Sequence, residues 1–107
     1  MTVSCEDEEL VEKIIDMLRT VYDPEIPVDI YELGLIYELN VDKENNLAVT
    51  MTLTAPNCPA SDVIVSDIEK RVGSIEALRS VGVHIVFDPP WDQGMMSEVA
   101  KLQLGFM

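Results

Sequence analysis

The feature that most constrains the fold is a pair of segments in which apolar and polar residues alternate. The first covers residues 35–41, the second covers residues 47–54, and Lys43-Glu44-Asn45-Asn46 lies between them. The apolar positions are Leu35, Tyr37, Leu39 and Val41 in the first segment and Leu47, Val49, Met51 and Leu53 in the second. A period of two is typical of a strand with one buried face, so the pair predicts an antiparallel hairpin.

A helix is expected before this hairpin. Ser4 can act as its N-cap, with Asp7 three positions later as in a capping box. Apolar residues then recur at helical spacing: Leu10, Ile14, Met17, Leu18 and Val21. Asp23-Pro24 ends the helix, because the residue before a proline is pushed out of the helical region. Residues 23–29 are interpreted as a loop stiffened by two prolines, and residues 29–34 as a short turn.

After the hairpin the pattern predicts a second helix over residues 60–72, a third strand over residues 81–87 and a short helix that Ser97 caps and Gly105 ends. The second helix buries Ile64, Ile68 and Val72. The order is helix, strand, strand, helix, strand, helix. We therefore expect one α+β domain over residues 1–107, with helices on one face of a small mixed sheet of at least three strands. The open edge of such a sheet would allow a homodimer.

The charge balance limits the partners. Of 107 residues, 20 are acidic and 7 are basic, which gives a formal net charge of −13. Such a surface repels phosphates and anionic lipids, so the sequence predicts no nucleic-acid and no membrane binding, whereas a basic partner protein would be attracted. The acidic N-terminus does not resemble a signal peptide, and no apolar stretch approaches the roughly 20 residues of a membrane span. With only two cysteines the chain is expected to work in the reducing cytoplasm.

Cys58 is the first candidate for chemistry. Pro59 suits the first position of the following helix, which would place Cys58 at the N-cap, where the helix dipole stabilises a thiolate. A thiolate attacks electrophiles or binds soft metals. The strong negative charge of the chain and Asp62 oppose a further negative charge, and free cysteines are often small buried apolar residues. Flanking prolines would hold the backbone of Cys58 rigid.

Metal binding by this chain alone has little support. The sequence contains no Cys-x-x-Cys pair, and its one histidine, His84, is expected on the exposed side of the third strand. Cys58 is a candidate metal ligand only together with another chain, a carboxylate or a small thiol. Cys5 lies in an N-terminal stretch expected to be mobile.

Other candidate residues have structural alternatives. Asp23 and Glu25 could form a carboxylate pair for acid–base work or could cap a turn. Trp91 is interpreted as a packing residue, and Met95-Met96 as an apolar plug or a partner-contact patch. The sequence contains no Ser/His/Asp set, no glycine-rich phosphate loop and no basic patch with interleaved aromatic residues.

Three motifs together resemble one family, the SufT/PaaD-like iron–sulfur cluster assembly domain family. The first is Asp23-Pro24-Glu25-Ile26-Pro27-Val28-Asp29 with Leu33-Gly34-Leu35-Ile36-Tyr37. The second is Met51-Thr52-Leu53-Thr54-Ala55-Pro56-Asn57-Cys58-Pro59. The third is Asp88-Pro89-Pro90-Trp91, followed by Met96-Ser97-Glu98 and Leu104-Gly105. The resemblance extends from the first helix to Gly105.

The resemblance implies an α+β fold like that of the C-terminal domain of cluster scaffold proteins. It implies a non-enzymatic maturation factor that helps iron–sulfur clusters reach apo-proteins, with cluster-assembly or carrier proteins as further partners. No tightly bound cofactor is expected, only transient iron or an iron–sulfur cluster. The reactive cysteine of the family falls on Cys58, its acidic loop on Asp23 and Glu25, and its threonine on Thr54, with Asn57 lining the same site.

Some features depart from this family or leave other functions open. Many relatives have a second threonine where this chain has Ala55, and the Cys-x-x-Cys of cluster scaffolds is absent. One alternative function is a thiol enzyme in which Cys58 is the nucleophile and His84 or Glu25 assists it. Another is an acidic adaptor without chemistry.

Overall fold

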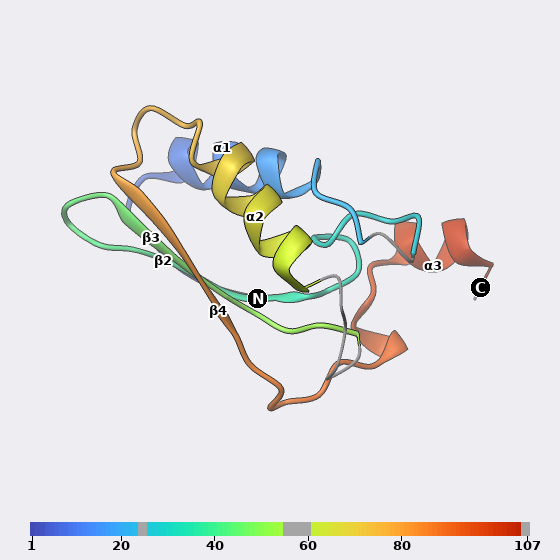
Figure 1. Cartoon of the computed structure of the whole chain (residues 1–107). Coiled ribbons are helices and arrows are strands. Elements are labelled where there is room, and N and C mark those ends of the chain that lie inside the picture. Colours follow the sequence, from blue (N-terminus) through green and yellow to red (C-terminus); the bar gives the residue numbers. More distant parts are fainter. Residues whose placement is uncertain (24–25, 55–60, 106–107) are drawn as a thin grey trace.

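A computed structural model shows a small α+β fold built on one four-stranded sheet (Figure 1), and it describes residues 1–23, 26–54 and 61–105. The strands are β1 (Thr2–Ser4), β2 (Ile36–Val41), β3 (Asn46–Met51) and β4 (Ser80–Ile85). The helices are α1 (Glu8–Leu18), α2 (Ser61–Val72), the short 3-10 helix η1 (Gln93–Met95) and α3 (Glu98–Leu104). The strand order is β1-β2-β3-β4, in which only the β2–β3 pair is antiparallel. The predicted fold class and the mixed sheet are confirmed.

Helices α1 and α2 lie together on one face of the sheet, and α3 lies beyond the end of the sheet (Figure 1). The core between the two layers holds Ile14 and Leu18 of α1, the predicted trio Ile64, Ile68 and Val72 of α2, and Leu39, Leu47, Val49 and Met51 of the sheet. Each of these side chains is at most 2% exposed. The alternating pattern of the hairpin and the helical stripe of α2 therefore meet in one core, as expected of a two-layer structure.

The prediction for the N-terminus is wrong. Ser4 does not cap a helix but lies in β1, where it pairs with Asn40 of β2. The N-cap is Asp7, whose carboxylate accepts a hydrogen bond from the Leu10 N–H at 3.2 Å. Backbone pairing with a distant strand holds the first residues extended, so the next suitable cap, Asp7, begins the helix. The expected order of elements therefore lacked a first strand, and the N-terminal stretch before Cys5 is part of the sheet.

Helix α1 also ends earlier than predicted, at Leu18 rather than near Val21. Val21 is fully buried all the same, and its carbonyl accepts a hydrogen bond from the Ile30 N–H at 2.9 Å. This bond gives the carbonyl of Val21 a partner in the loop that follows. Val21 fits the apolar spacing of the helix although it lies beyond the helix end, because the chain stays in contact with the core after it leaves the helical conformation.

Strand β2 departs from simple alternation at Tyr37. The register shifts between Ile36, which is opposite Met51, and Glu38, which is opposite Thr50. Tyr37 is the extra residue of this bulge, so it leaves the apolar row in which the sequence placed it. Leu35 and Ile36, just before the bulge, are both buried although they are adjacent.

The second half of the chain follows the prediction more closely. Helix α2 covers Ser61–Val72, and Ala60, the predicted first residue, lies outside the described residues. Strand β4 ends at Ile85, and Phe87 beyond it is 46% exposed rather than part of the strand. The Ser97 side chain caps α3 by accepting from the Ala100 N–H, and Gly105 ends that helix in the left-handed region at φ 77°. Both predicted caps of α3 are confirmed.

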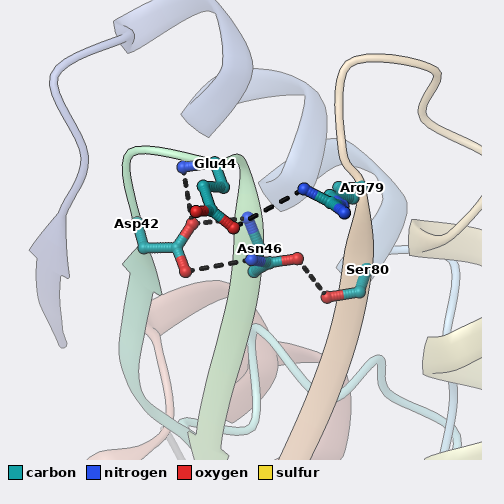
Figure 2. A network of polar contacts seen from close by, with 5 residues as sticks. All are labelled: Asp42, Glu44, Asn46, Arg79 and Ser80. Atoms are coloured by element: carbon teal, nitrogen blue, oxygen red, sulfur yellow. Dashed lines mark hydrogen bonds and ion pairs between the residues drawn. The ribbon is translucent and has the colours of Figure 1, made fainter.

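The turn of the β2–β3 hairpin is held by one carboxylate (Figure 2). Asp42 accepts hydrogen bonds from the backbone N–H groups of Glu44 and Asn46, each at 2.9 Å, and from the Asn46 side chain at 3.1 Å. Asn46 in turn accepts from the Ser80 hydroxyl at 2.7 Å, and Arg79 lies 3.5 Å from Glu44. These contacts join the hairpin to the start of β4. Hydrogen bonds from Asn46 lower the pKa of Asp42.

Candidate functional site

The loop that follows α1 is joined to the end of β3 by a series of backbone hydrogen bonds. Ile30 donates to Val21 at 2.9 Å, Leu35 donates to Ile30 at 3.2 Å, and Thr52 donates to Leu35 at 2.9 Å. Thr52 directly follows β3 and is fully buried. The first two family motifs, separate in sequence, are therefore linked through the backbone at one end of the sheet.

Asp23 lies in this loop and is buried, with 4% of its surface exposed. Its neighbour Tyr22 forms an isolated antiparallel bridge with Asp29, so the two ends of the predicted acidic loop lie side by side. The carboxylate of Asp29 accepts from the Glu32 N–H at 3.0 Å and thereby caps the turn that follows. Burial raises the pKa of Asp29. The predicted turn over residues 29–34 is confirmed, and Asp29 is the acid that caps it.

Three predicted site residues, Glu25, Asn57 and Cys58, lie outside the described residues. The N-cap position of Cys58 and its pairing with Asp23 and Glu25 therefore stay predictions. Thr54, the last described residue before residues 55–60, is partly buried two positions after Thr52.

The third motif begins a segment, residues 88–97, that crosses back over the turn at residues 31–37; we call it the return segment. The indole N–H of Trp91 donates to the Leu33 carbonyl at 2.7 Å. The Tyr37 hydroxyl donates to the Pro89 carbonyl at 2.8 Å, and the Ser97 N–H donates to the Glu32 carbonyl at 2.8 Å. Trp91 is partly buried and packs against the core. These contacts support the interpretation of Trp91 as a packing residue.

Gly34 makes the close approach of the return segment possible. Its φ is 79°, and a Cβ added there would lie 2.2 Å from the Met95 carbonyl oxygen. The sequence interpretation did not identify this role, because the contact depends on a segment about sixty residues further along the chain. Met96, the neighbour of Met95, is 4% exposed and belongs to the core, so it cannot form part of an exposed partner patch.

A cavity of about 580 Å³ lies between the return segment and this turn. Its lining includes Tyr31, Tyr37, Pro89 and Met95. Burial raises the pKa of Tyr37, whose hydroxyl also lies 3.5 Å from the Met95 sulfur. Among the described residues, its lining is largely aromatic and apolar and includes no histidine, cysteine or carboxylate.

The remaining candidates do not belong to any cluster of possible metal ligands among the described residues. His84 is exposed on β4 next to Thr50 of β3, as predicted, and Cys5 is partly buried with its sulfur 3.6 Å from the Asp7 carbonyl. Asp88, Pro90 and Glu98 are exposed, and Glu98 lies in the first turn of α3, where the helix dipole favours a negative charge. Within the described residues, no group of three or more histidines, cysteines or carboxylates could hold a metal ion.

No helix in the described part of the chain has the length and apolar character needed to cross a membrane.

Comparison with known proteins identifies the family. The family model described as iron–sulfur cluster assembly protein matches residues 11–85. An Fe–S protein maturation auxiliary factor from Porphyromonas gingivalis is 53% identical over 96 residues, which cover 90% of this chain and 91% of that protein. The Fe–S protein maturation auxiliary factor YitW from Bacillus subtilis is 40% identical over 99 residues, covering 92% and 97%. The crystal structure of a domain of unknown function, DUF59, from Bacillus anthracis matches with a TM-score of 0.87 at 39% identity and covers 94% of this chain and 95% of that one. The chain therefore belongs to the family of iron–sulfur cluster assembly proteins.

Proposed function

We propose that this chain is a maturation factor that helps iron–sulfur clusters reach recipient apo-proteins, and that it does so without being an enzyme. Two relatives that it matches over nine tenths of its length are called Fe–S protein maturation auxiliary factors. We place its action in the reducing cytoplasm, where thiols stay free. Its net charge of −13 favours recipients or carriers with a basic surface.

The group that we propose to contact iron is the thiol of Cys58. Helix α2 begins at Ser61, three residues after this cysteine, so the amino end of a helix of 12 residues follows the thiol closely in sequence. The positive end of a helix dipole stabilises a nearby thiolate, which is the form that binds iron. Iron or a cluster would be the cargo of this thiol and would be bound only in transit.

The observation that supports a shared site is the series of backbone hydrogen bonds from Val21 to Thr52. It links the loop containing the buried Asp23 to the segment that leads through Thr54 toward Cys58. A carboxylate near a thiolate can complete the coordination of a ferrous ion, because both are anionic ligands. We propose that Asp23, Glu25, Thr54 and Asn57 line the site.

The test compares the two cysteines of the chain. Anaerobic incubation with ferrous iron and sulfide should produce visible absorption by bound iron–sulfur species in the parent and in Cys5→Ser, and should lose it in Cys58→Ser. Cys5 is a matched control because it also comes shortly before a helix. Its sulfur lies by the Asp7 carbonyl, at the amino end of α1. Equal spectra for both variants would contradict the proposal.

A cellular test uses the same pair of variants. In cells that depend on this chain, the activity of an iron–sulfur enzyme should fall in Cys58→Ser and should be retained in Cys5→Ser, with the level of each variant checked by immunoblot. Full activity in Cys58→Ser at a normal protein level would show that maturation does not require this thiol.

A further inference from the structure

Strand β4 lies at one end of the sheet, and no described strand pairs with its outer edge. Among the described helices and strands, β4 contacts β3 and α2 and no other element. Figure 1 shows the strand running along the border of the sheet, with α2 on the same side of the sheet as α1. An open edge presents unpaired backbone groups that can pair with another strand.

The strand lacks the features by which edges are usually protected. Its sequence, Ser80-Val81-Gly82-Val83-His84-Ile85, contains no proline, no lysine and no carboxylate, although a quarter of the chain is charged. Its register with β3 is regular over all six residues, so no bulge turns the edge away. At the opposite border, β1 has only three residues, and shortness alone limits pairing there.

The register shows which backbone groups face outward. The Val86 N–H donates to the Met51 carbonyl at 2.8 Å, and Ile85 is opposite Met51 in a parallel pair. Successive residues of a strand direct their backbone groups to opposite sides. Gly82 and His84 therefore bond to β3, and the N–H and C=O groups of Val81, Val83 and Ile85 point to the open edge.

We propose that β4 pairs with β4 of a second copy of this chain, in an antiparallel register with the two-fold axis at Val83. Residues opposite each other in an antiparallel pair share a face, so this register keeps the helices of both copies on one side of a continuous sheet. Val83 then bonds to its own counterpart, and Val81 exchanges hydrogen bonds with Ile85 of the other copy. An axis at Gly82 or at His84 would leave one end of the strand unpaired.

The side chains on the open face match in this register. Gly82 of one copy lies opposite His84 of the other, as a pair without mutual hydrogen bonds, in which side chains approach most closely. The His84 imidazole of one copy can therefore occupy the space over Gly82 of the other copy, where there is no side chain. In the single chain, a Cβ added at Gly82 would meet one atom of the described residues within 4 Å, the Leu47 carbonyl oxygen at 4.0 Å.

Charge affects the strength of this pairing but not its register. Two copies, each with a net charge of −13, repel each other at low ionic strength, whereas the strand itself carries no carboxylate and no lysine. Screening should therefore strengthen the dimer. We favour a second copy over a foreign peptide because, about Val83, the outward-facing residues Val81, Val83 and Ile85 of two copies pair with each other and the histidine of each copy lies opposite the glycine of the other.

The experiment measures the monomer–dimer equilibrium by sedimentation equilibrium in about 0.05 M and about 0.5 M NaCl. The parent should form dimers, more tightly at high salt. Gly82→His places two imidazoles against each other and should raise the dissociation constant about tenfold or more through overpacking. The exchange Gly82→His with His84→Gly restores one histidine opposite one glycine in the same register, and it should recover most of the affinity.

Circular dichroism would confirm that each variant folds. The proposal is overturned if the folded parent stays monomeric up to millimolar concentration, as it would if the edge takes a strand of another protein. It is also overturned if Gly82→His dimerises as tightly as the parent, or if the exchanged variant is as weak as Gly82→His. This inference concerns the sheet edge and does not depend on the role of Cys58.

Discussion

At the scale of single residues, two positions depend on groups that lie far from them in the sequence. Gly34 has a φ of 79° and packs directly under the Met95 carbonyl. Asp29 is half-buried by the turn that it caps, and burial raises its pKa. Both residues belong to the loop and turn between α1 and β2, which also contains the buried Asp23.

Replacing Gly34 with alanine should destabilise the fold. The new Cβ would have to avoid the Met95 carbonyl oxygen, 2.2 Å from its ideal position, and the backbone would keep a positive φ. We expect a loss of about 1–3 kcal/mol in the free energy of unfolding, measured with urea. Gly105→Ala is the control, because Gly105 also has a positive φ, 77°, but its Cβ would meet no atom within 4 Å. Equal losses in the two variants would show that the contact with the return segment contributes nothing.

Asp29 should make stability depend on pH in a predictable direction. Its pKa is raised above 3.8, so the folded chain holds this proton more tightly than the unfolded chain does. The contribution of Asp29 is therefore most favourable below pH 3.8 and is lost as the pH rises through its folded pKa. Asp29→Asn should gain stability relative to the parent as the pH rises across this range, as measured by urea midpoints.

The control for this pH series is Asp16→Asn, which removes the same charge from an exposed position on α1. If the difference in urea midpoint between the parent and Asp29→Asn stayed constant from pH 3 to neutral pH, the raised pKa assigned to Asp29 would be contradicted.

At the scale of elements, the hairpin turn depends on one exposed carboxylate. Hydrogen bonds from Asn46 lower the pKa of Asp42 below 3.8 (Figure 2). Because the folded chain binds this proton less tightly than the unfolded chain, the contribution is present above pH 3.8 and is lost as the pH falls through the folded pKa. Asp42→Asn should be less stable than the parent at neutral pH, and the gap should close in acid.

The measurement is again a series of urea midpoints, with Lys43→Gln as a control for changing a charge in the same turn. If the gap between parent and Asp42→Asn widened as the pH fell, the assigned direction of the pKa shift would be wrong.

The hairpin and α2 were predictable because their signals are local. Period-two alternation in residues 47–53 and the spacing of Ile64, Ile68 and Val72 each place apolar residues on one face, and burial then followed. The Ser97 and Gly105 caps were predictable for the same reason. The bulge at Tyr37 was not predictable, because apolar and polar residues alternate regularly in this segment of the sequence and only the pairing with β3 shifts the register.

At the scale of the whole molecule, the dominant property is the net charge of −13. Basic residues Arg19 and Arg79 form ion pairs with Glu32 and Glu44 at 3.6 and 3.5 Å, and such partly exposed pairs contribute little to stability. Excess negative charge destabilises a compact state through self-repulsion.

Adding salt should therefore stabilise the folded chain. The free energy of unfolding should rise as NaCl increases from about 0.02 M to about 0.5 M, because the Debye length falls over this range. Urea unfolding of the parent at a concentration at which it is monomeric measures this effect without a contribution from dimerisation. A lower urea midpoint at high salt would show that local ion pairs, rather than net repulsion, dominate the electrostatics.

The candidate site was predicted in part. The sequence pointed to Asp23 and to the segment from Thr54 to Cys58. The structure joins the Asp23 loop to the end of β3 through backbone hydrogen bonds, and none of the sequence motifs indicated these bonds. The sequence also treated Trp91 as a packing residue without indicating its partner, the Leu33 carbonyl.

The sequence by itself determined the class of fold, the central hairpin, α2 and both ends of α3, because periodicity and capping act between residues a few positions apart. Tertiary structure alone decided that Ser4 joins a strand and Asp7 caps α1, that Tyr37 leaves its row, and that the return segment lies against Gly34. Each of these depends on backbone groups finding partners far along the chain, and such pairing is settled only when the whole core assembles.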